Sequence, residues 1–162
     1  DDIEWHFIGA IQSNKTKTIA AQFDWVHTLD REKVARLLSL HRPDHLPPLK
    51  VLIQVNISNE ANKSGVALEH LDALVEQVTQ LPKLLLCGLM CIPAAGQTES
   101  NQHRAFNAMA TARDQLNRTY PHIKQLSMGM SGDLSSAIAC GSTMVRIGTD
   151  IFGSRDTLTP AP

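Results

Sequence analysis

Short, strongly apolar segments alternate with helical segments along almost the whole chain, and this alternation restricts the fold more than any other feature. The clearest of them, Lys50–Ile57 (KVLIQVNI), is β-branched and nearly uninterrupted, as expected of a strand covered on both faces. Regular alternation of such strands with helices predicts a parallel sheet of the α/β class. We expect six strands, at Trp5–Gly9, Trp25–Leu29, Lys50–Ile57, Leu84–Ile92, Leu126–Met130 and Met144–Ile147.

The segments between these strands carry apolar residues at helical spacing. Asp30 is expected to cap the second helix, whose apolar positions are Val34, Leu37 and Leu38. Gly141 is expected to close the fifth helix with a positive φ angle. The inward positions of the fourth helix are predicted to be Phe106, Met109, Ala112 and Leu116. The predicted helices are Asn14–Gln22, the segment after Asp30, Ala67–Gln80, Asn101–Thr119 and Leu134–Cys140.

Two parallel architectures fit this pattern, an open doubly wound sheet and a (β/α)8 barrel. No GxGxxG motif follows the first strand, which weakens the dinucleotide-binding version of the open sheet. A barrel places polar residues at the carboxyl ends of its strands and a phosphate site after the last two. Asn56, Ser131 and Gly148–Thr149 follow predicted strands in this way, and a barrel counted back from them lacks its first two strands. The residues alone leave both architectures open.

The last two apolar runs each end in small residues whose backbone N–H groups can face an anion. Ser131 and Gly132 follow the first run, and Gly148 and Thr149 follow the second. Arg146 lies inside the second run, from where its guanidinium can reach a heteroatom of a ring that carries the phosphate. The alternative is two buried strands with tight turns and a surface salt bridge for Arg146.

Other motifs favour structural roles. The sequence GMSGD is close to a nucleophile elbow but has Asp133 where the second glycine belongs, so a serine hydrolase is not expected. The seven histidines are scattered, which argues against a metal site. His6 and His27, inside predicted strands, are expected to be core histidines with satisfied hydrogen bonds. Cys87 and Cys91 are four residues apart in one strand, which predicts that both lie in the core on the same face.

The bulk properties exclude several classes of protein. The 162 residues predict a single domain over residues 1–156, with a tail at residues 157–162. A formal net charge of −1 offers no footprint for nucleic acid or an anionic membrane. No apolar run is long enough to span a bilayer and no secretory leader opens the chain, so we expect a cytoplasmic protein without a membrane partner. The first residues reach a strand almost at once, so we expect the chain to begin inside a larger fold.

Several motifs in the same order resemble one family over nearly the whole chain. WHFIGAIQSNK, VLIQVNIS, NKSGV, GLMCIP, LSMGMSGD and GSTMVRIGTDIFGSR closely resemble the pyridoxal phosphate homeostasis protein family. That family has the fold of the N-terminal barrel of alanine racemase. The resemblance therefore implies a (β/α)8 TIM-type barrel, truncated here to about six βα units. It also implies a protein of vitamin B6 homeostasis that binds pyridoxal 5′-phosphate (PLP) at the barrel mouth without known turnover and buffers or delivers it.

The resemblance assigns the phosphate side of the site to the two small-residue turns. Ser131 and the amides of Gly148 and Thr149 would hold the phosphate, with Ser127 or Met130 nearby.

The ring side is assigned to three other residues. Arg146 would point at the pyridine nitrogen, Met90 would pack against the ring and Asn56 would line the mouth. A cation at the pyridine nitrogen disfavours its protonation and so weakens the ring as an electron sink.

The chain departs from the family at the covalent anchor. The V-S-K motif that carries the Schiff-base lysine is absent, and Lys15 and Lys63 belong to other motifs. We therefore expect PLP to bind without a covalent bond, and no catalysis. Full-length family members are often monomers. A six-stranded piece, however, has two open edges, which predicts self-association or pairing with an N-terminal segment.

Two alternatives remain. An alanine-racemase-like enzyme needs a catalytic tyrosine, and the single tyrosine here, Tyr120, is placed at the end of an outer helix. A barrel fragment that binds no PLP and associates through its open edges is the other.

Overall fold

The computed structural model describes residues 3–58, 63–94 and 96–153. Its centre is a parallel sheet in which every strand pairs with the next one along the chain, in the order β1-β2-β3-β4-β5. A doubly wound sheet reverses its strand order near the middle, whereas a barrel does not. The unreversed order therefore confirms the barrel type of α/β fold. The strands are β1 (His6–Phe7), β2 (Trp25–Leu29), β3 (Leu49–Val55), β4 (Leu84–Cys91) and β5 (Gln125–Ser127).

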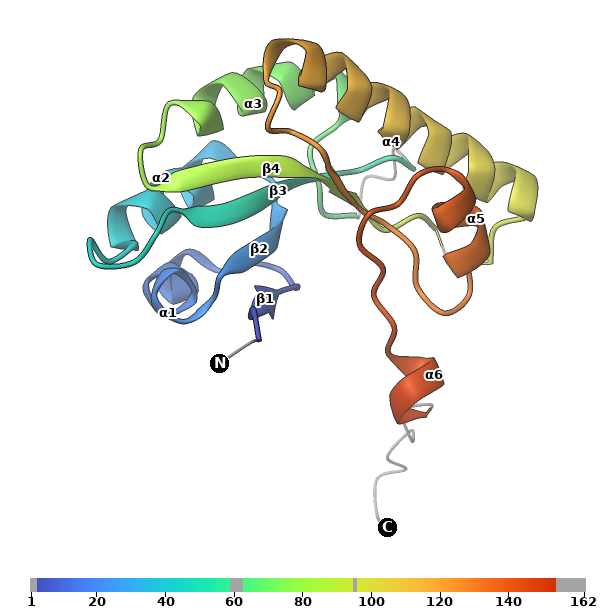
Figure 1. Cartoon of the computed structure of the whole chain (residues 1–162), viewed down its shortest axis with the longest axis horizontal. Coiled ribbons are helices and arrows are strands. Elements are labelled where there is room, and N and C mark those ends of the chain that lie inside the picture. The colour runs from blue at the N-terminus through green and yellow to red at the C-terminus, as the bar shows by residue number, and fades with distance from the viewer. Residues whose placement is uncertain (1–2, 59–62, 95, 154–162) are drawn as a thin grey trace.

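The helices form an outer layer around the curved sheet, and Figure 1 shows α1 to α4 following one another along its outer side. The last two helices are short and lie beyond the carboxyl ends of the strands (Figure 1). The elements are η1 (Ser13–Lys15), α1 (Thr16–Gln22), α2 (Glu32–His41), η2 (Leu68–His70), α3 (Leu71–Thr79), α4 (Glu99–Thr119), α5 (Leu134–Ala139) and α6 (Thr149–Phe152).

The main hydrophobic core lies between the outer face of the sheet and the helices. The inward residues predicted for α4 are all buried there, which confirms the helical phase read from the sequence. Phe106, with no exposed surface, is the largest side chain fully buried in this layer. Because each helix buries one apolar stripe against the strands, this layer holds the βα units together.

The inner face of the sheet carries a second, much smaller cluster. It consists of Trp25, Leu52, Cys87 and Met90, with Met144 packed against it. Val51 pairs with Leu86 and Leu52 pairs with Gly88, so Cys87 is an extra residue in β4. This bulge reverses the side-chain alternation.

The bulge corrects the prediction that Cys87 and Cys91 share one face. Cys87 belongs to the inner cluster, whereas Cys91 is buried in the outer core. Burial raises the pKa of the Cys87 thiol to about 11 and that of the Cys91 thiol to about 12.

Two further predictions are wrong in detail. The expected sixth strand, Met144–Ile147, makes only one isolated bridge, between Met144 and Ser127. Backbone hydrogen bonds from Met128 to Met144 and from Arg146 to Gly129 still join the two segments, but Gly129, with a φ of +100°, is not extended, so the regular ladder does not continue. Asp30 does not cap α2; its carboxylate instead accepts a hydrogen bond from Arg31 at 2.7 Å.

Two expectations concern the ends and the surroundings of the chain. The predicted tail at residues 157–162 lies outside the described residues. Among the described helices, none is both long enough and apolar enough to cross a membrane.

Candidate functional site

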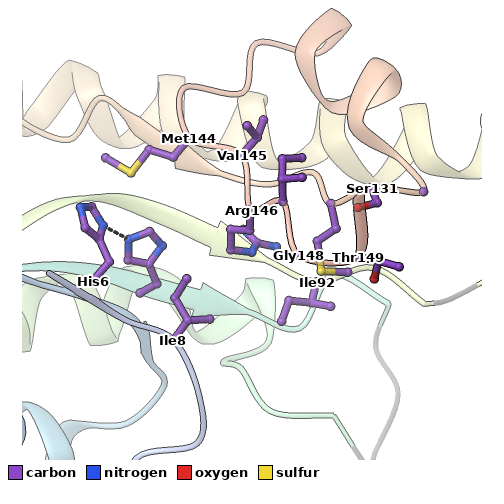
Figure 2. A pocket seen from close by; sticks show the side chains of 13 residues that line it. His6, Ile8, Ile92, Ser131, Met144, Val145, Arg146, Gly148 and Thr149 are labelled. Atoms are coloured by element: carbon purple, nitrogen blue, oxygen red, sulfur yellow. Dashed lines mark hydrogen bonds between the residues drawn. The ribbon is translucent and has the colours of Figure 1, made fainter. Parts of the chain in front are cut away.

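A cavity of about 1010 Å³ lies at the carboxyl ends of the strands, the end of a barrel where binding sites form. Residues from β1, β2 and the two small-residue turns near the C-terminus surround it, and Figure 2 shows Arg146 between the histidines and the turn with Ser131. The lining residues are His6, Ile8, His27, Ile92, Met130, Ser131, Gly132, Met144, Val145, Arg146, Ile147, Gly148 and Thr149.

Arg146 is anchored at the wall of this cavity by two hydrogen bonds. Its Nη1 donates to Ser127 Oγ at 2.7 Å, and its Nη2 donates to the carbonyl oxygen of Cys91 at 2.9 Å. Its backbone N–H donates to Gly129 O at 2.9 Å, which fixes the segment against the end of β5. Burial lowers the pKa of Arg146, but a guanidinium stays charged at neutral pH. The surface salt bridge considered from the sequence is therefore not its role.

A histidine pair continues the hydrogen-bond chain away from Arg146. His27 Nδ1 lies 2.8 Å from Ser127 Oγ, and His27 Nε2 lies 2.7 Å from His6 Nδ1. Burial, reinforced by His6 and Arg146, lowers the pKa of His27 to about 4. Burial also lowers the pKa of His6. Both imidazoles are therefore favoured in the neutral form at pH 7. Within this series of hydrogen-bonded groups, the fixed positive charge is on Arg146.

The turn after β5 supplies a small polar pocket. Ser131 Oγ is buried and has no hydrogen-bond partner among the residues that the structure describes. The Asp133 carboxylate accepts the Met130 N–H at 2.6 Å, and the Asp133 N–H donates back to Met130 O at 3.0 Å. Leaving a buried hydroxyl unpaired costs about 1 to 3 kcal/mol, so Ser131 is ready to bind an incoming polar group.

The second turn lies on the same side of the cavity. Gly148 precedes α6, and its carbonyl accepts the N–H groups of Ile151 and Phe152 at 3.0 and 2.9 Å. Both Gly148 and Thr149 are exposed and line the cavity. A Cβ at Gly148 would meet nothing within 4 Å, so a methyl group is accommodated there.

Five of the eight residues predicted for the site line the cavity together: Met130, Ser131, Arg146, Gly148 and Thr149. Ser127 lies behind Arg146 and is fully buried. Met90 is not a lining residue: it is fully buried in the inner cluster, against which the lining residue Met144 packs. Asn56 does not line the cavity; its Nδ2 donates to Lys63 O at 3.4 Å.

Sequence reasoning missed the histidine pair and the apolar rim. His6 and His27 were expected to be satisfied core residues; His27 is buried and hydrogen-bonded as expected, but it also lines the cavity. The signal was the alternation in β2, which places Trp25 and His27 on one face. Ile8 and Ile92 form exposed apolar rim positions; both lie within quoted motifs, WHFIGAIQSNK and GLMCIP, but neither was assigned to the site.

The described lining of this cavity lacks the lysine of a covalent PLP site and the tyrosine of a racemase. Within the described part of the chain, no lysine lines it, and Tyr120 packs instead against the outer core at the end of α4. The described residues also contain no cluster of three or more side chains suited to hold a metal ion. The arrangement thus offers an anchored cation and a polar turn for an anion.

Comparison with known proteins agrees with this geometry. The family model "Alanine racemase, N-terminal domain" matches residues 3–156. The pyridoxal phosphate homeostasis protein of Vibrio cholerae is 56% identical over 154 residues, which cover 95% of this chain and 65% of that protein. The corresponding protein of Pseudomonas aeruginosa is 54% identical over 159 residues, covering 98% of this chain and 68% of that protein. The chain thus spans about two thirds of the length of these relatives.

Solved structures lead to the same family. PipY of Synechococcus elongatus, solved with PLP bound, superimposes with a TM-score of 0.85 at 32% identity, covering 94% of this chain and 72% of PipY. The alanine racemase of Clostridium difficile superimposes with a TM-score of 0.74 at 13% identity, covering 96% and 40%, and this likeness concerns the fold alone. The chain belongs to the pyridoxal phosphate homeostasis protein family, built on the fold of the N-terminal domain of alanine racemase.

Proposed function

We propose that this chain binds PLP in the cavity without a covalent bond and serves vitamin B6 homeostasis in the cytoplasm. The observation that carries the proposal is the presence, in one cavity, of an anchored guanidinium and a buried hydroxyl that has no partner among the described residues. A ligand with a phosphate at one end and a ring acceptor at the other satisfies both. The PLP-bound relative and the family membership support the same ligand.

The phosphate is assigned to the turns that carry Ser131, Gly148 and Thr149. The Ser131 hydroxyl donates to a phosphate oxygen, which relieves its lack of a partner. The exposed backbone at Gly148 and Thr149 adds N–H donors on the same side of the cavity. Met130, 38% exposed, covers one side of this region with an apolar surface.

The ring is assigned to the space in front of Arg146. Two of the five N–H groups of the guanidinium are used by Ser127 and Cys91, so the others remain for a ring acceptor. When bound, PLP supplies an aldehyde and an electron-withdrawing ring, and a cation facing the ring nitrogen keeps that nitrogen unprotonated. Ile8 and Ile92 offer apolar surface to the faces of a flat ring.

We also propose that no turnover takes place in this cavity. The lining described here has neither a lysine nor a tyrosine to act as a base. The described lining does contain two imidazoles, but both ring nitrogens of His27 are within hydrogen-bond distance of Ser127 and His6, so we assign the residues in place to binding and orienting a ligand.

A PLP titration followed by absorbance tests this function. We expect saturable binding, no reduced adduct in the intact mass after borohydride treatment, and no racemisation of alanine. Because Arg146→Ala removes a charged hydrogen-bonding group, it should weaken binding by about 10- to 100-fold. Arg36→Ala, which removes an exposed arginine of α2 paired with Glu32, is the matched control and should bind like the original chain.

Three results would contradict the proposal: no saturable binding, a stoichiometric adduct after reduction, or measurable formation of D-alanine.

A further inference from the structure

His27 is placed to control how Arg146 meets a ligand, and the hydrogen bonds of the described residues link the two through Ser127. The path runs from His6 at the surface through His27 and Ser127 to the guanidinium, with contacts of 2.7, 2.8 and 2.7 Å. Both ends lie in the cavity wall, whereas Ser127 has no exposed surface. Each link is short enough to be a full hydrogen bond.

The direction of these hydrogen bonds follows from the donors available. Arg146 can only donate, so Ser127 Oγ is an acceptor for it and its own hydroxyl hydrogen must point elsewhere. Among the described residues, the acceptor within hydrogen-bond distance of this hydroxyl is Nδ1 of a neutral His27. The remaining hydrogen of His27 is then on Nε2 and is donated to His6 Nδ1.

Each group in the chain therefore fixes the next. With His27 as acceptor, the Ser127 hydroxyl presents its lone pairs to Arg146, and the guanidinium is held flat between Ser127 and the Cys91 carbonyl. Without that acceptor, the Ser127 hydroxyl is free to rotate, and its hydrogen competes for the space that the guanidinium N–H occupies. The guanidinium is then held less firmly, and its remaining N–H groups are no longer fixed in their direction toward the cavity.

We propose that His27 is a positioning residue that gives the cavity its preference for ligands with an unprotonated ring nitrogen. This inference rests on the proposed function and deepens it, because it assigns recognition of the ring acceptor to a residue that acts through Ser127 and Arg146. The phosphate turns do not take part in the hydrogen-bond chain. Ring recognition and phosphate binding are consequently separable by mutation.

The experiment compares three probes on the same protein: PLP, its analogue in which a CH group replaces the ring nitrogen, and inorganic phosphate. His27→Ala should weaken PLP binding about 10-fold, the equivalent of one hydrogen bond. It should leave the affinities for the carbon analogue and for inorganic phosphate unchanged. His27→Asn, whose Oδ1 can replace Nδ1 as the acceptor, should return PLP affinity to within about threefold of the original.

The outcomes separate failure of the inference from failure of the proposed function. If the original chain binds none of the probes, the proposed function fails and this inference falls with it. If PLP binds but His27→Ala lowers the affinity for all three probes equally, His27 has a structural role only. If His27→Ala leaves PLP affinity unchanged, or His27→Asn fails to restore it while circular dichroism shows a folded chain, the positioning role is refuted.

Discussion

The two faces of the sheet differ in chemistry and in what they determine. The outer face is covered by helices and buries a continuous apolar core, whereas the inner face has a four-residue cluster and a chain of polar contacts. On the outer side Phe106 and Leu89 have no exposed surface, whereas inner Leu85 is 41% exposed. The outer face therefore contributes most of the stability of the fold, and the inner face provides the groups that recognise a ligand.

This difference explains why a series of hydrogen-bonded polar groups lies beside an open cavity. A buried histidine, serine and arginine are tolerated only when each is hydrogen-bonded, and here every one has a partner. The polar groups add little net stability, since each hydrogen bond replaces one with water. Their arrangement is better explained by recognition than by folding.

The largest expected effect is a truncation on the outer face. Phe106→Ala should lower the free energy of unfolding by about 3 to 5 kcal/mol, because the helix layer cannot collapse into the space left by the ring. Leu52→Ala, in the inner cluster, should cost about 2 kcal/mol, the lower limit for a buried leucine, because the cluster has only four members and Met144, packed against it, can shift into the space. Urea denaturation measures both.

Leu40, on α2, is 71% exposed and provides the control, since Leu40→Ala should change the free energy of unfolding by less than about 0.5 kcal/mol. Equal costs for Phe106→Ala and Leu52→Ala would show that the two faces contribute alike.

A smaller effect is expected at the turn that joins the two faces. Gly129 has a φ of +100°, and a Cβ there would lie 2.7 Å from the Cβ of Ala137. Gly129→Ala should therefore lower the free energy of unfolding by about 2 to 4 kcal/mol and displace the turn with Ser131, weakening phosphate binding.

Ala137→Gly removes the facing methyl group but itself destabilises α5, so the effect of Gly129→Ala is compared in the two backgrounds. Gly129→Ala should cost less in the Ala137→Gly chain than in the original one, since only the backbone strain remains. Equal costs in the two backgrounds, measured by thermal unfolding, would show that the contact with Ala137 is not the cause.

The outer face was the more predictable of the two. Residues such as Phe106 and Met109 repeat at helical spacing. Strands that are apolar on both faces, such as β3, predict a sheet that is buried on both faces. The bulge at Cys87 was not predictable, because it depends on how β3 and β4 align rather than on any local preference. The sixth strand was also not predictable, since the positive φ at Gly129 takes the facing segment out of the extended conformation although Arg146 still donates its N–H to Gly129 O.

The candidate site was predictable only where its functional residues belong to short sequence motifs. Small residues after apolar runs, and the resemblance that they carry, pointed to Ser131 and Arg146. The histidine pair was not recognised, because its partners lie 21 and 100 residues apart in sequence. Long-range polar contacts of this kind depend on register and curvature, which no local pattern encodes.

The smallest expected effect is a pH dependence that belongs to the inner face alone. The pKa of His27 is lowered by burial, His6 and Arg146 to about 4, against about 6.5 in the unfolded chain. Between these values the unfolded chain binds a proton that the folded chain does not, so stability falls as the pH drops from about 6.5 to about 4. The contribution is at most about 3 kcal/mol, fully present above pH 6.5 and absent below pH 4.

His27→Asn, which does not titrate, should remove this part of the slope when urea midpoints are compared at several pH values. The exposed His122 gives the matched variant, and His122→Asn should keep the slope of the original chain. Other groups titrate in the same range, so the difference between the His27→Asn and His122→Asn curves is the quantity to measure. A flat difference across pH 4 to 6.5 would mean that His27 is protonated as readily in the folded chain as in the unfolded one. The hydrogen-bonded groups on the inner face would then tolerate a second positive charge beside Arg146. That result would contradict the hydrogen-bond directions assigned above, which require a neutral His27.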